Sequence, residues 1–206
     1  MINKLKDNFN MIAIDLKRRQ NDLGRYISIK KQYNSSVDLE NNLEFQKTYK
    51  TFYVMNATGL TDKYFKKYFK LLNTRKFNSQ DKLSDFLIKL DGIPTRTSNN
   101  SMQLAFATKA LHTINNKLPI YDKHIANFFQ LAQIPNDTKN NLSDRIIFRQ
   151  SIYNELVDKF NCLLSGKEIA DLIKEAQDFF ADIKDINEIS DTKMLDFIIW
   201  TYGSIK

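Results

Sequence analysis

The residues best suited to chemistry lie close together in the middle of the 206-residue chain. Residues 115–119 interrupt a helical pattern of apolar residues. Lys109 and His112 precede this break, and Asp122, Lys123 and His124 follow it. The protein has no histidines besides these two. A lysine amine can attack an electrophilic carbon when its pKa is lowered, and a carboxylate can stabilise developing positive charge or activate water. Residues 104–129 are therefore the first candidate for a catalytic site.

Two helices are expected to position these side chains. The first covers residues 102–114, and Lys109 projects almost opposite its apolar face, given about 100° per residue. The apolar positions of that face recur at helical spacing and are Leu104, Ala107, Leu111 and Ile114. The second helix is expected to begin at Asp122, after a break that contains Pro119. The pattern thus predicts a helix, a short loop and a second helix.

Each candidate also has an ordinary structural interpretation. A lysine on the polar face of a helix is usually solvated. Asp122 can act as an N-cap, in which its carboxylate accepts hydrogen bonds from first-turn amides and contributes about 1 kcal/mol. His124 can be a packed or a surface imidazole. Periodicity alone does not decide between these interpretations and a catalytic one.

The order of residues around the break resembles a known superfamily. A lysine-bearing helix continues through residues 110–115, a loop with a proline follows, and the next helix opens on Tyr121, Asp122, Lys123, His124 and Ile125. This arrangement is similar to the helix-hairpin-helix DNA glycosylases, nearest their oxoguanine-processing branch. The resemblance implies an all-α, glycosylase-like fold and excision of a damaged or modified base from DNA. It also implies that Asp122 assists departure of the base and that, as in members with lyase activity, Lys109 attacks the sugar C1′ and forms a Schiff base.

The segment before the lysine helix departs from the superfamily's pattern. Members that hold DNA through the hairpin usually carry a Leu-Pro-Gly-x-Gly type of turn, whereas residues 98–102 contain no glycine. The interval from Lys109 to Asp122 is 13 residues, several fewer than usual in the superfamily. We expect other groups to replace the hairpin and contact or position DNA. They are Arg96, Ser98, Asn99, Asn100, Ser101, His112, Lys123 and His124.

The rest of the chain predicts an all-α protein with eight or nine helices. Only 5 Gly and 3 Pro are present, fewer turn residues than an all-β or doubly wound fold would need. One helix is predicted over residues 2–18 and another over residues 37–57, with Gly59 just past its end. Residues 22–36 are predicted to be a connection, because their pattern is irregular. Residues 93–100 are polar, and they are either a loop of one unit spanning 1–206 or the boundary between two lobes.

Composition limits the partners and cofactors. A net charge of +7 and a pI of about 9.3 favour a polyanionic partner, here DNA. Apolar runs are too short for a membrane span, and no secretory signal is visible, so we expect a cytoplasmic protein with no membrane contact. The single Cys162 excludes the four-cysteine iron–sulfur cluster of some glycosylases. We expect no metal and no other cofactor.

Two other functions fit the same observations. The first is a non-catalytic helical module that binds nucleic acid or a protein on the same fold, which predicts salt-dependent binding without base release. The second is a regulatory helical protein with no nucleic-acid role, which predicts that the charge of +7 is spread evenly over the surface and not gathered around residues 115–119.

Overall fold

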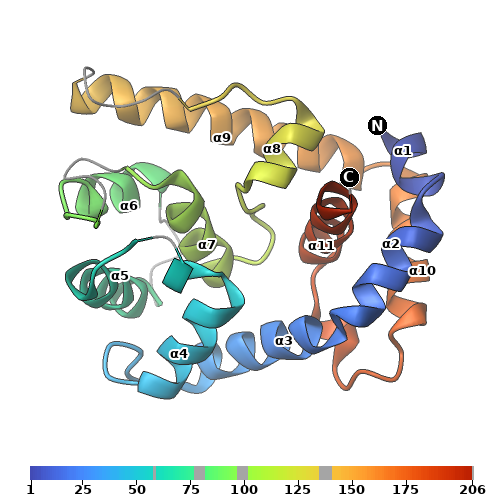
Figure 1. Ribbon diagram of the computed structural model, residues 1–206, viewed down its shortest axis with the longest axis horizontal. Helices are drawn as coiled ribbons and strands as arrows, with labels where there is room; N and C mark the ends of the chain where they lie inside the picture. Colours follow the sequence, from blue (N-terminus) through green and yellow to red (C-terminus); the bar gives the residue numbers. More distant parts are fainter. Residues whose placement is uncertain (58, 77–81, 97–101, 135–140, 206) are drawn as a thin grey trace.

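The computed structural model describes residues 1–57, 59–76, 82–96, 102–134 and 141–205, and its regular elements there are all helices (Figure 1). They are α1 (Ile2–Lys6), α2 (Phe9–Arg18), α3 (Gln20–Ser35), α4 (Leu43–Phe52), η1 (Met55–Ala57), α5 (Asp62–Arg75), α6 (Leu83–Leu90), α7 (Leu104–Ile114), α8 (Lys123–Phe129), α9 (Leu142–Leu164), α10 (Lys167–Phe179), η3 (Ile186–Glu188) and α11 (Asp191–Ser204). The prediction of an all-α protein is confirmed. Eleven α-helices lie in these ranges instead of eight or nine, because residues 2–18 form two helices and residues 20–35 form a further one.

The predicted connection at residues 22–36 is wrong, since most of it belongs to α3. The buried face of α3 includes Leu23, Tyr26, Ile27 and Tyr33. Two of these residues are tyrosines, whose rings are buried although each carries a hydroxyl. Because tyrosines form part of its buried face, α3 does not show the regular spacing of purely apolar residues that predicts a helix.

The predicted helix over residues 37–57 is too long. It begins only at Leu43, where the Asn42 side chain caps it by accepting a hydrogen bond from the Phe45 amide at 2.9 Å. It ends at Phe52, and Val54 then adopts the left-handed conformation with φ 53°. Gly59, with φ 70°, completes the turn toward α5, as its place in the sequence suggested.

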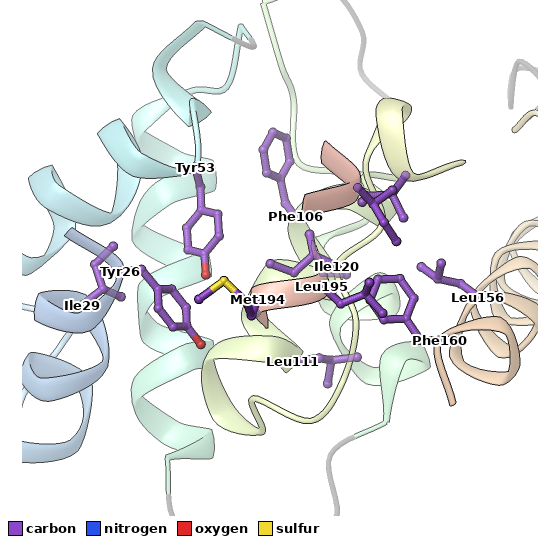
Figure 2. Packing of buried hydrophobic residues seen from close by; sticks show 14 of the residues in the cluster. Tyr26, Ile29, Tyr53, Phe106, Leu111, Ile120, Leu156, Phe160, Met194 and Leu195 are labelled. Carbon is purple, nitrogen blue, oxygen red and sulfur yellow. The ribbon is translucent and has the colours of Figure 1, made fainter. Parts of the chain in front are cut away.

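Helix α11 lies at the centre of the fold, between α8 on one side and α2 and α10 on the other (Figure 1). Its residues Met194, Leu195, Ile198 and Ile199 are fully buried. Figure 2 shows side chains from α3, α7, α9 and α11 filling the interior around it. The buried apolar residues form a single cluster that draws on helices from α1 to α11. No described helix is long and apolar enough to cross a bilayer.

Candidate active site

Four of the predicted site residues, Lys109, Asp122, Lys123 and His124, line one cavity of about 620 Å³. The cavity lies among the end of α4, the start of α3, one face of α7, the N-terminus of α8 and α11. Its volume is in the range of sites that bind small organic molecules. The fold therefore brings the lysine and the acid into the same space, although a loop separates them in the sequence.

Lys109 reaches into the cavity from α7. Its Nζ donates a hydrogen bond to the Tyr53 carbonyl oxygen at 3.0 Å and lies 4.8 Å from the centre of the Phe106 ring. Burial lowers the pKa of Lys109 to about 8; the charge of Asp122 opposes this, and that of Lys193 adds to it. A substantial fraction of the amine is then neutral near pH 8, as a nucleophile requires. Lys109 is not an ordinary solvated lysine.

Asp122 is the N-cap of α8, as the structural interpretation predicted. Its Oδ1 accepts a hydrogen bond from the His124 amide at 2.7 Å. The residue is half-buried, lines the cavity, and interacts electrostatically with Lys109 and Asp196. The cap therefore fixes the position of the carboxylate while the carboxylate contributes charge to the cavity.

The loop between α7 and α8 is held by side chains from three directions. Four consecutive carbonyl oxygens accept hydrogen bonds, from Ser190 to Asn116 (2.7 Å), from Thr192 to Lys117 (3.3 Å), from His112 to Leu118 (2.6 Å) and from Tyr153 to Pro119 (3.1 Å). The Tyr121 amide donates to Thr108 Oγ1 at 3.0 Å, which ties the end of the loop back to α7. Pairing these backbone groups compensates for their burial and fixes the loop. Asp122 is thus placed relative to α7 by a rigid connection.

His112 is fully buried, and its ring supports this loop. Because a carbonyl can only accept, Nδ1 must donate to Leu118, and Nε2 then accepts from the Tyr26 hydroxyl at 2.8 Å. Burial holds the pKa of His112 well below its ordinary value, and the nearby Lys193 acts in the same direction. The neutral ring thus joins the loop before α8 to Tyr26 on α3.

His124 and Lys123 lie at the cavity wall. The His124 ring packs edge-on against Trp200 at 5.4 Å between centroids. Gly203 makes room for it, since a Cβ there would lie 2.8 Å from the His124 Cβ. Lys123 is exposed.

The remaining predicted DNA-contacting residues precede α7. Arg96 is exposed and lies outside the cavity, where its amide donates to the Gly59 carbonyl at 2.7 Å. Ser98, Asn99, Asn100 and Ser101 lie outside the described residues, and their predicted roles remain predictions.

Sequence reasoning missed a second lysine–aspartate pair in the cavity, on α11. Lys193 Nζ donates to Asp196 Oδ2 at 2.6 Å, and the two residues are only 3% and 6% exposed. The ammonium also lies 4.3 Å from the centre of the Phe197 ring. Burial raises the pKa of Asp196, and the charge of Lys193 opposes this. In the sequence, Lys193 and Asp196 stand three residues apart next to the apolar run of residues 197–200, a spacing that indicates a buried ion pair.

Aromatic rings make up much of the rest of the cavity wall. Phe52, Phe106, Phe197 and Trp200 come from α4, α7 and α11. The Arg19 guanidinium lies 4.9 Å from the centre of the Trp200 ring. Flat apolar walls with a few charged groups suit a planar heterocycle.

Val54 projects from the rim of this cavity in a strained conformation. Its φ of 53° is unusual for a β-branched residue, and its side chain is 62% exposed. Residues held in sparsely populated backbone conformations cluster at functional sites, so Val54 is a candidate for a functional position.

No model of a known protein family, no curated protein and no solved structure matches this chain significantly. Within the part of the chain that the structure describes, no three His, Cys, Asp or Glu side chains are grouped as a metal site would need. The function is therefore inferred from the geometry of the cavity.

The pH dependence of Lys109 follows from its surroundings. We expect its acylation by a lysine-selective reagent to rise through a midpoint near pH 8, whereas exposed lysines titrate near pH 10.4. Replacing Asp122 with Asn removes a negative charge that favours the ammonium, so the midpoint should fall. Peptide mass mapping at a series of pH values measures both midpoints. An unchanged midpoint in the variant would show that the two side chains do not interact.

Proposed function

We propose that this protein is a DNA glycosylase that excises a damaged or modified base, with Lys109 as nucleophile and Asp122 as the acid group. The observation that carries the proposal is that Lys109, its pKa lowered to about 8, and Asp122 line one aromatic-walled cavity. The resemblance of residues 109–125 to the helix-hairpin-helix glycosylases supports the same reaction. The all-α structure agrees with the fold class that the resemblance implies.

The proposed reaction uses the two side chains in different ways. The lone pair of the neutral Lys109 amine forms a bond to the sugar C1′, and the N-glycosidic bond breaks, its electron pair leaving with the base. Positive charge develops on the sugar as the base departs, and the Asp122 carboxylate stabilises it. The attached nitrogen then gives one proton to the departed base, its lone pair forms the C1′=N bond of the protonated Schiff base, and the C1′–O4′ bond breaks as O4′ takes a proton from solvent. Lys109 must be neutral when it attacks, which its lowered pKa favours.

The aromatic walls supply the second requirement of the reaction. An enzyme that acts on a base within a duplex must take the base out of the stack and hold it in a pocket. The rings of Phe52, Phe106, Phe197 and Trp200 provide apolar faces, and about 620 Å³ leaves room for a nucleotide base and its sugar.

The Asp122→Asn variant tests the proposal without disturbing the fold. Asn caps a helix about as well as Asp, so the free energy of unfolding should change little. Loss of the carboxylate should lower the single-turnover rate of base release by about 10²-fold or more, as for other groups that stabilise the charge of a transition state. Release is measured on duplexes that carry oxidised or alkylated bases. Wild-type protein that binds these duplexes and releases no base would favour the non-catalytic binding module instead.

Val54 offers a separate test of base extrusion. Apolar side chains can fill the gap that an extruded base leaves in a duplex. Val54→Gly should cut base release from duplex DNA about tenfold and leave release from single strands unchanged, because a single strand has no stack to restore. Glycine adopts the φ of 53° without strain, so stability should change by no more than about 1 kcal/mol. Val37→Gly, at an exposed site outside the cavity lining, is the matched control. Equal loss on both substrates would contradict this role.

A further inference from the structure

The positive charge of the protein is unevenly distributed along the chain. Residues 43–76, from α4 to just past α5, contain eight basic and two acidic residues and so carry +6. Residues 141–206 contain eight basic and twelve acidic residues and carry −4.

The exposed face of α5 holds the densest part of this charge. Lys63, Lys66, Lys67 and Lys70 are all exposed and follow the spacing i, i+3, i+4, i+7, which places them on one stripe. The opposite face carries buried residues such as Tyr64, Tyr68, Phe69 and Leu72. Among the described residues, no ion pair involves any of the four lysines. Like charges at this spacing repel one another and weaken the helix, so the fold itself gains nothing from them.

Helices α5 and α7 both lie between this lysine stripe and the cavity. Tyr64 packs edge-on against Phe106 at 6.2 Å, and the Tyr68 hydroxyl donates to the Phe106 carbonyl at 3.1 Å. Phe106 lines the cavity on the other side of α7. Arg96 is exposed, and its amide donates to the carbonyl oxygen of Gly59, three residues before α5 begins.

We propose that Lys63, Lys66, Lys67 and Lys70, together with Arg96, form a surface that binds the sugar–phosphate backbone of the DNA substrate. The proposal rests on the proposed DNA substrate, and it names a surface through which the protein binds the DNA backbone. Lysines act as point charges, so the contact is independent of base sequence.

The length of the lysine stripe and the burial of the apolar face of α5 both favour DNA as the partner of this surface. The stripe from Lys63 to Lys70 spans about 10 Å along the helix axis, a length over which duplex DNA carries about six phosphate charges. A helix that lies on a lipid surface buries its apolar face in the bilayer, whereas the apolar face of α5 is buried in the protein core.

The test compares two variants with equal loss of charge. One replaces Lys63, Lys66, Lys67 and Lys70 with Gln, and the control replaces Lys4, Lys167, Lys174 and Lys184 with Gln. The control lysines are exposed and lie on or beside α1 and α10, at the opposite end of the molecule from α5 (Figure 1). Binding of the full-length protein to an undamaged duplex is measured at several salt concentrations.

The slope of log Kobs against log salt concentration should become shallower by about 3.6 in the α5 variant, since each of the four lost phosphate contacts contributes about 0.9. The control should keep the wild-type slope. Equal slopes in the two variants, or no DNA binding by the wild type, would overturn the proposal. So would an α5 variant that loses binding to anionic phosphatidylserine vesicles while its DNA slope is unchanged.

The binding experiment and the base-release experiment can fail independently of each other. If the wild type binds with the steep slope but releases no base, the reaction fails while the surface stands. If the α5 variant releases base and keeps the steep slope, the surface fails while the reaction stands.

Discussion

Replacement of Lys109 with Gln is expected to lower the single-turnover rate of base release by at least about 10³-fold, because the variant has no amine to attack C1′. The side chain is half-buried and its Nζ is held by the Tyr53 carbonyl at 3.0 Å. Glutamine is nearly as long and can donate the same hydrogen bond. Folding should therefore be retained, and denaturant unfolding measured in parallel checks this.

Lys109→Arg separates nucleophilicity from charge at the same position. Arginine keeps the positive charge and the donor groups but stays protonated, so it should be as inactive as the Gln variant. If the Arg variant kept most of the activity, Lys109 would act through its charge, and the covalent mechanism would be wrong.

The second large effect is on stability. Asp196→Ala is expected to lower the free energy of unfolding by about 3–5 kcal/mol, because it leaves the Lys193 ammonium buried without its carboxylate. The two groups are 2.6 Å apart and almost fully inaccessible to solvent. Urea unfolding followed by circular dichroism measures the loss.

The double variant Lys193→Met/Asp196→Leu provides the contrast. Replacing both partners of a buried pair with apolar residues is often neutral or stabilising. We expect the double variant to be more stable than Asp196→Ala by several kcal/mol. If it were as unstable as the single variant, packing around α11, and not an unpaired charge, would explain the loss.

Local signals made much of the helical architecture predictable. Helices α7, α9 and α10 have clean apolar spacing, and the cap at Asp122 follows from its place before an apolar run. Helix α3 was missed because tyrosines carry part of its buried face. The regular apolar spacing at residues 2–18 hid the break between α1 and α2.

The cavity could not be predicted from local patterns, because the residues that line it lie far apart in the sequence. Lys193 and Asp196 reach Lys109 only because α11 runs through the centre of the fold. The short interval of 13 residues between Lys109 and Asp122 also becomes understandable in three dimensions. The loop is held at four carbonyls by α7, α9 and the start of α11, so few residues suffice to bring both side chains to one cavity.

The most direct test of the proposed reaction is to identify the residue that becomes covalently attached to DNA. The wild-type protein is incubated with duplexes that carry oxidised or alkylated bases in the presence of borohydride, which reduces a Schiff base to a stable bond. Digestion and mass spectrometry then locate the adduct. The account predicts a single adducted peptide, modified at Lys109. An adduct at Lys193 or another amine, or base release with no adduct on any substrate, would contradict it.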